Sequence, residues 1–201
     1  EKVRDPQLDN GLVRYWTFDE VNGTNAFAGR GNYNGTLSGG AAFASGKFGN
    51  AVEFDGNASE VDFGMGAGDL GDRFTVSVWV KWTGTEQPGN AKRILGNKND
   101  WNSTDGWSMF TGNNNDTGAL VRGSSDTAIS PNVTSSWKAN NWHHLVAAFD
   151  DGSVEVFADG TSRLSGTVSS VTSGGKSLKM GKTWGSSANS FEGLVDDLRL
   201  Y

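Results

Sequence analysis

Leu194-Val195-Asp196-Asp197-Leu198-Arg199-Leu200-Tyr201 ends the chain, and a similar stretch, Leu12-Val13-Arg14-Tyr15-Trp16-Thr17-Phe18-Asp19-Glu20, stands near its start. Both stretches combine acidic residues with a run of apolar and aromatic residues, which favour β-strands. A carboxylate that is buried without a partner costs several kcal/mol of folding free energy. We therefore expect the two stretches to be the strands that close one β-sandwich, with a cation beside their acidic residues.

The composition predicts a single all-β domain. The 201 residues suffice for one sizeable core, and they include 29 glycines, 8 tryptophans and 11 phenylalanines but only 3 prolines. Glycines indicate turns, and few prolines leave long strands uninterrupted. Residues 1–10 are interpreted as a polar lead-in or linker, and residues 11–201 as the domain. Because the sequence begins without Met, we expect a part of a longer protein with covalently linked neighbouring domains.

Charge and cysteine content exclude several classes of protein. The formal net charge is -6, and no stretch gathers enough Lys and Arg to follow the phosphates of a nucleic acid or an anionic membrane. No apolar run approaches the roughly 20 residues of a membrane helix, so we expect no membrane insertion. The absence of cysteine excludes disulfides, thiolate metal sites and a cysteine nucleophile. We expect a secreted or cell-surface location.

Alternation of apolar and polar residues predicts most strands. Residues 74–82 form the clearest run, with Val76, Val78 and Val80 on one face, and are predicted to be a central strand. Asp151-Gly152 and Asp159-Gly160 each predict a tight hairpin turn. Two alternating runs, 51–56 and 60–64, predict a further hairpin. Shorter strands are expected at 93–96, 106–111 and 118–122.

Five blocks of sequence carry a resemblance that covers almost the whole chain. Their order is similar to that of the laminin-G-like, concanavalin A-like jelly-roll domains of bacterial and archaeal surface proteins. The resemblance implies two packed antiparallel sheets, one of them curved, and a carbohydrate-binding or adhesive module within a larger secreted protein. The blocks are Tyr15-Trp16-Thr17-Phe18-Asp19-Glu20, residues 46–56, Phe74-Thr75-Val76-Ser77-Val78-Trp79-Val80, residues 142–150 and residues 191–201.

Laminarinase-type hydrolases share this fold, but the sequence argues against catalysis. Those enzymes place their nucleophile and general acid in a Glu-x-Asp-x-x-Glu strand. Glu60 and Asp62 begin this pattern, but Met65 stands where the acid belongs, and a thioether cannot protonate a leaving oxygen. His143 and His144, the two histidines, are expected on opposite faces of a strand, so that they cannot jointly hold one metal. We predict no catalytic residues.

A structural calcium ion is predicted where the chain ends meet. Calcium takes about six to eight oxygen ligands from carboxylates and backbone carbonyls. The resemblance to laminarinase-type enzymes implies that Glu20, Gly23 and Asp196 hold such an ion. Asp197 is interpreted either as a further ligand or as a solvent-facing residue. The alternative is that these carboxylates lie at the surface without a metal.

Ligand binding is predicted from the aromatic residues. Sugars combine an apolar face with a rim of hydroxyls, so their sites pair exposed rings with polar side chains. Trp16, Trp79, Trp107 and Trp142 lie in strand-like blocks and are predicted to be core residues, whereas Trp101 and Trp184 lie in polar loops. The predicted ligand-binding residues are Trp101, Trp184, Arg93, Asn99, Asp100 and Asn114.

The sequence therefore predicts a noncatalytic carbohydrate-binding module that targets a polysaccharide or oligosaccharide. Two alternatives stay open at this point. The first is an adhesion or structural domain that binds protein, and the second is a glycoside hydrolase or polysaccharide lyase.

Overall fold

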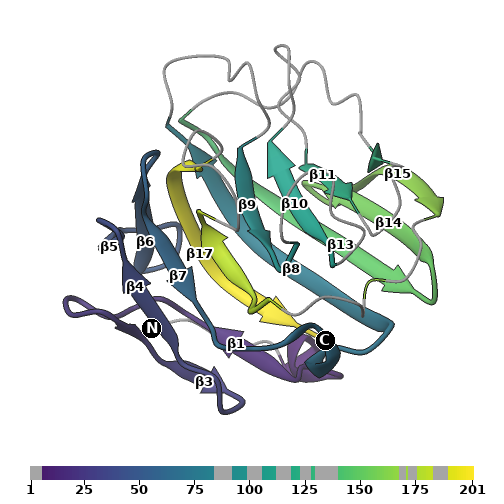
Figure 1. Ribbon diagram of the computed structural model, residues 1–201, viewed down its shortest axis with the longest axis horizontal. Helices are drawn as coiled ribbons and strands as arrows, with labels where there is room; N and C mark the ends of the chain where they lie inside the picture. Colours follow the sequence, from purple (N-terminus) through teal and green to yellow (C-terminus); the bar gives the residue numbers. More distant parts are fainter. Residues whose placement is uncertain are drawn as a thin grey trace.

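Two antiparallel β-sheets packed face to face form the structure, which is a computed structural model (Figure 1). It describes residues 6–83, 92–98, 106–111, 119–122, 128–129, 140–167, 171, 176–182 and 190–201. Among these residues, two short 3-10 helices, η1 (Pro6–Asp9) and η2 (Ala67–Asp69), accompany the strands. The predicted all-β, two-sheet sandwich is confirmed.

The described strands of sheet A lie in the order β15-β14-β13-β8-β17-β1-β3, with β6 paired to β17 and β5 paired to β6. They are β1 (Arg14–Trp16), β3 (Ala28–Arg30), β5 (Ala42–Ser45), β6 (Asn50–Asp55), β8 (Arg73–Trp82), β13 (Trp142–Asp150), β14 (Ser153–Ala158), β15 (Thr161–Thr167) and β17 (Glu192–Leu200).

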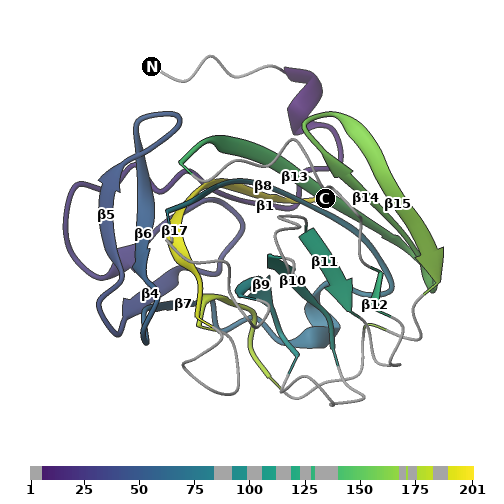
Figure 2. The same ribbon diagram turned by 90° about the horizontal axis from the view of Figure 1, so that it is seen from above.

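The described strands of sheet B lie in the order β12-β11-β10-β9-β16-β7-β4-β2. They are β2 (Asn25–Ala26), β4 (Gly35–Ser38), β7 (Glu60–Asp62), β9 (Arg93–Gly96), β10 (Ser108–Thr111), β11 (Ala119–Arg122), β12 (Ala128–Ile129) and β16 (Lys179–Gly181). Sheet A curves around sheet B, and η1 lies outside sheet A (Figure 2).

Strand β8 is central, as predicted, because it pairs with β13 on one side and with β17 on the other. Val76, Val78 and Val80 are at most 1% exposed and belong to the core between the sheets. Alternation turns Ser77 and Trp79 to the opposite side, which we call the outer face of sheet A.

The two predicted Asp-Gly hairpins are confirmed. Strands β13 and β14 pair up to Asp150 and Ser153, and Asp151 and Gly152 between them have φ angles of 45° and 88°. Positive φ at both central residues is the turn geometry that matches the twist of a two-residue hairpin. The turn between β14 and β15 has the same character.

The predicted hairpin of residues 51–56 and 60–64 is wrong. Strand β6 belongs to sheet A, whereas β7 pairs with β16 and β4 in sheet B, so the chain crosses between the sheets here. Val52 and Phe54 of β6 and Val61 of β7 all lie in the core. Alternation identifies the buried face of each strand, but both sheets bury their faces in the same core, so it does not assign a strand to its sheet.

The last strand, β17, changes its neighbour at two successive aspartates. On one edge it pairs with β6 up to Val195 and with β1 from Leu198 onward, and Asp196 and Asp197 lie between. On the other edge Asp196 faces Trp79 and Arg199 faces Ser77, so β17 has one extra residue in this interval. The predicted meeting of the first and last strands is confirmed, and it occurs at a β-bulge.

Candidate functional site

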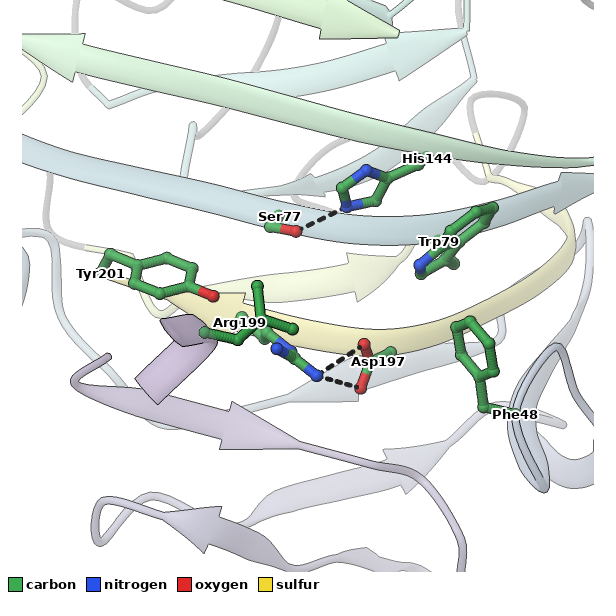
Figure 3. A pocket seen from close by; sticks show the side chains of 8 residues that line it. Phe48, Ser77, Trp79, His144, Asp197, Arg199 and Tyr201 are labelled. Atoms are coloured by element: carbon green, nitrogen blue, oxygen red, sulfur yellow. Dashed lines mark hydrogen bonds and ion pairs between the residues drawn. The ribbon is translucent and has the colours of Figure 1, made fainter. Parts of the chain in front are cut away.

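A cavity of about 390 Å³ opens on the outer face of sheet A. Its walls come from β8, β13 and β17, from the loop before β6 and from η1. In Figure 3, Asp197 and Arg199 lie on one side, His144 and Ser77 lie on the other, and Trp79 and Phe48 lie at one end. The lining residues are Leu8, Phe48, Ser77, Trp79, His144, Asp197, Arg199 and Tyr201.

Trp79 is half-buried in this cavity, so the prediction that it is a core residue is wrong. Its ring stacks on His144 with 4.9 Å between centroids, and the edge contact with Phe48 is at 5.6 Å. The Lys47 ammonium lies 4.7 Å from the centroid of the same indole. The sequence could have predicted the outward position of Trp79, because this residue alternates with the buried valines of β8 and must therefore lie on the opposite face.

Of the other three predicted core tryptophans, Trp16 and Trp107 are buried, as expected. Trp142 is half-buried and not part of the core, so the prediction that it is a core residue is also wrong. It faces Lys81 on β8 in the strand pairing.

The two histidines point to opposite sides of β13, as predicted. His143 is buried, and its Nδ1 lies 2.8 Å from Asp159 Oδ2. His144 faces the cavity, and its Nε2 lies 2.8 Å from the Ser77 hydroxyl. Burial lowers the pKa of His144 below its ordinary value, although the negative charge of Asp197 acts in the other direction. His144 is therefore a neutral imidazole at neutral pH.

Asp197 is only 7% exposed, so the interpretation of this residue as solvent-facing is wrong. Its Oδ2 lies 3.2 Å from Arg199 Nη2, and its Oδ1 accepts a hydrogen bond from the Tyr15 hydroxyl at 2.5 Å. Burial, and then the hydrogen bond to Asp197, raise the pKa of Tyr15, so its hydroxyl remains a neutral donor.

The bulge in β17 explains how both aspartates face outward. Val195 and Leu198 belong to the core, and two residues rather than one separate them. Asp197 has a φ of 54°, the left-handed conformation that Asp tolerates better than most residues. Asp196 is fully buried, and its Oδ2 accepts a hydrogen bond from the Phe48 amide at 2.8 Å.

Residues 19–20, 46–50 and 196–197 form what we call the closing seam, where the chain start meets β17. The Asn50 amide donates to Asp19 Oδ1 at 3.0 Å, and Asn50 Nδ2 donates to the Glu20 carbonyl at 3.1 Å. Glu20 Oε1 accepts from the Phe27 amide at 2.7 Å. Because Asn50 holds Asp19 and Glu20 while Phe48 holds Asp196, one loop joins both acidic segments.

The donor set of the closing seam fits calcium. Glu20 Oε2 is buried and has no hydrogen-bond partner among the described residues, which is an unfavourable state for a carboxylate oxygen. Carboxylates and backbone carbonyls are the ligands that calcium prefers. Within the described ranges, however, no three Asp, Glu or His side chains converge as a metal cluster. Backbone oxygens and water would have to complete the shell.

Gly23 is not brought into this arrangement by any described contact. It is exposed in the loop between β1 and β2, and no non-neighbouring described atom lies within 4 Å of the point where a Cβ would stand. Its part in calcium binding stays a prediction.

Most of the predicted ligand-binding residues, namely Trp101, Trp184, Asn99, Asp100 and Asn114, lie outside the described residues. Their role stays a prediction. Arg93 is described and is only 2% exposed, with its guanidinium carbon 5.6 Å from the centroid of the Phe110 ring. Arg93 is therefore an interior residue, and its part in ligand binding stays a prediction.

The partial hydrolase motif begins on β7 of sheet B, whereas the strands that line the cavity belong to sheet A. Lys179 Nζ lies 3.0 Å from Glu60 Oε1 and 3.3 Å from Asp62 Oδ2. Met65 is fully buried in the core. The two carboxylates are thus in ion pairs, and the third position of the motif is an apolar core position.

Comparisons with known proteins agree with this architecture. The family model of the concanavalin A-like lectin/glucanases superfamily, of the laminin G type, matches residues 54–201. A search of curated proteins found no match. Within the described residues, no helix has the length and apolar character needed to cross a membrane.

Several solved structures are similar to the chain. Domain 4 of AbnA, an extracellular GH43 arabinanase from Geobacillus stearothermophilus, in complex with arabinotriose, is 24% identical with a TM-score of 0.72, over 94% of this chain and 91% of that domain. A mutant Trypanosoma rangeli sialidase is 18% identical with a TM-score of 0.67, over 96% of this chain and 31% of that chain. The botulinum neurotoxin serotype D binding domain is 14% identical with a TM-score of 0.66, over 94% of this chain and 48% of that chain. At these identities the likenesses show the fold alone.

The environment of His144 predicts a measurable pKa. In the folded protein its imidazole should titrate below the ordinary value of 6.5, because burial disfavours the charged form. The unfolded chain then binds more protons, so the free energy of unfolding falls as the pH drops from 6.5 through the folded pKa. NMR titration of the imidazole resonances measures this directly, with the urea-unfolded protein as the reference. A His144 titration at or above the unfolded value would contradict the cavity environment described above.

Proposed function

Because the chain belongs to the concanavalin A-like lectin/glucanases superfamily, we propose that it is a carbohydrate-binding module without catalytic activity. The observation that carries the proposal is the cavity at Trp79, where aromatic walls and hydrogen-bonding side chains meet on a sheet face. Sugar rings offer apolar C–H faces and polar hydroxyls, and such mixed cavities suit them.

The contacts within the cavity support an oligosaccharide as the ligand. Phe48 and Trp79 provide apolar surface, while Ser77, His144 and Tyr201 provide groups that exchange hydrogen bonds with hydroxyls. The similar domain 4 of AbnA was solved in complex with arabinotriose, which supports the same ligand class here. The predicted loop residues Trp101 and Trp184 offer an alternative site on the same module.

Two observations support a noncatalytic role. The position of the missing acid is the buried Met65, and Glu60 is held by Lys179. Ser77 and His144 form the hydrogen-bonded pair with which a nucleophilic site begins, but such a site also needs a group that orients the imidazole. Among the described residues, the imidazole of His144 bonds to Ser77, and its backbone amide bonds to Asp159. Neither contact supplies a second group that orients the imidazole, so the pair does not amount to a nucleophilic site.

We propose a secreted or cell-surface location, as one module of a larger protein. The similar AbnA domain is part of an extracellular enzyme, and the chain spans only about a third of the similar sialidase. A protein-binding adhesion domain is the alternative. It predicts no glycan binding at all.

We also propose that the closing seam holds a structural calcium ion. Glu20 and Asp196 would bind it together with backbone oxygens, and Gly23 remains a candidate ligand. The support is the buried, unpartnered Glu20 Oε2 and the loop that joins both acidic segments. The ion would neutralise these carboxylates and stabilise the junction of β1 and β17.

Trp79→Ala is expected to weaken carbohydrate binding by about fivefold to tenfold, since one aromatic contact contributes about 1 to 1.4 kcal/mol. Affinity electrophoresis against soluble polysaccharides, followed by calorimetry on the best ligand, measures the loss. Trp142→Ala is the matched control, because Trp142 is a half-buried tryptophan on the next strand that does not line the cavity.

Trp101→Ala and Trp184→Ala, measured in parallel, test the loop site. If only these two variants lose affinity for carbohydrate, the binding site lies on the loops and not at the cavity on sheet A. Absence of binding to every polysaccharide by the wild-type domain would leave the adhesion alternative.

Calcium is expected to raise the melting temperature, and removal of calcium with a chelator is expected to lower it. A ligand present at 100 times its dissociation constant stabilises the folded state by about 2.7 kcal/mol. Calorimetry with and without calcium checks this. Glu20→Gln should abolish the response to calcium, whereas Glu53→Gln, at an exposed carboxylate of β6, should retain it. An identical melting temperature with calcium and with chelator would contradict the proposed ion.

A further inference from the structure

We infer that the cavity at Trp79 selects uncharged sugar residues and rejects sugar acids such as uronic acids. This inference rests on the proposed function, since it concerns the ligand of the same cavity. It follows from the charges of the lining side chains and from how those charges are already paired.

Arg199 is the one formal cation among the described residues that line the cavity, and it is already engaged. Its Nη2 lies 3.2 Å and 3.5 Å from the two carboxylate oxygens of Asp197. The side chains of Arg199 and Asp197 are only 16% and 10% exposed, so water screens the pair weakly. A sugar carboxylate that approached Arg199 would also approach Asp197, which repels it.

The other lining residues that the structure describes add no positive charge. His144 is neutral at neutral pH, because burial lowers its pKa. Tyr15, which donates to Asp197 from beside the cavity, stays neutral as well because its pKa is raised. The formal charge of the described lining residues is therefore zero, and two partners, Arg199 and Tyr15, hold the carboxylate of Asp197 in place.

Lys47 at the rim does not change this balance. Its ammonium lies over the indole of Trp79, and the residue is exposed, so solvent and salt screen its charge. An incoming carboxylate therefore meets only a weak, screened positive charge on this side.

The cavity has uncharged hydrogen-bonding groups, which suit the hydroxyl groups of a sugar. The Ser77 hydroxyl both donates and accepts, and a neutral imidazole has one donor and one acceptor nitrogen. These two lie across the cavity from the Asp197–Arg199 pair (Figure 3). A hydroxyl can donate to the carboxylate of Asp197 or accept from Arg199 without separating them.

The test compares neutral trisaccharides of arabinose, xylose, galactose and mannose with trisaccharides of galacturonic and mannuronic acid. Calorimetry should show binding of at least one neutral trisaccharide by the wild-type domain, and at least about tenfold weaker binding of both acidic ones. NMR shifts of the Trp79 indole and His144 imidazole place the ligand in this cavity. The affinity for the neutral sugar should be unchanged between about 50 and about 500 mM salt.

Asp197→Asn then exposes the charge of Arg199. Asn tolerates the left-handed backbone at this position and still accepts the Tyr15 hydrogen bond, so the fold should be kept. The variant should gain about tenfold or more in its preference for acidic over neutral trisaccharides. Asp150→Asn is the matched control. It removes an exposed aspartate that pairs with Arg73 at 2.9 Å, and it should leave the preference unchanged.

The possible outcomes separate the two claims. Equal or tighter binding of the acidic trisaccharides by the wild-type domain, or a neutral affinity that falls steeply with salt, overturns the charge inference while carbohydrate binding stands. The same holds if a folded Asp197→Asn protein keeps the wild-type preference, or if the shifts of Trp79 and His144 do not respond to a bound sugar. Absence of binding to any of the trisaccharides overturns the inference together with the proposed ligand class.

Discussion

The β-bulge at Asp196 and Asp197 is the constraint on which the rest of the structure depends. An extra residue in β17 turns two successive carboxylates to the outer face, where regular alternation would bury one of them in the core. Each carboxylate then has different partners. Asp197 pairs with Arg199 and Tyr15 at the cavity, whereas Asp196 accepts from the Phe48 amide at the closing seam.

Phe48 connects the cavity at Trp79 with the closing seam. Its backbone amide donates to Asp196, and its ring contacts the ring of Trp79. The loop that carries it is tied to Asp19 and Glu20 through Asn50. A calcium ion that orders the closing seam would therefore also hold one wall of the cavity in position. This arrangement makes the proposed ion a support for binding rather than a participant in it.

The parts of the fold that depend on local chemistry could be predicted from the sequence. Asp-Gly turns specify positive φ angles within a few residues, and the valines of β8 specify a buried face. The crossover between β6 and β7 could not be predicted, because alternation does not assign a strand to one of two sheets that share a core. Likewise, the bulge that turns Asp197 to the outer face depends on the partners of β17, which are distant in the sequence. The position of Trp79 could have been predicted from its alternation with the valines of β8. It was instead predicted to be a core residue because it lies in a strand-like block.

The central claim is that the outer face of sheet A, at Trp79, is where this module binds carbohydrate. A crystal structure of the domain soaked with a neutral oligosaccharide tests it most directly. A sugar ring is expected between the Asp197–Arg199 pair and the Ser77–His144 pair, in contact with Trp79. A sugar seated only on the loops that contain Trp101 or Trp184, with the cavity at Trp79 holding water alone, would contradict it.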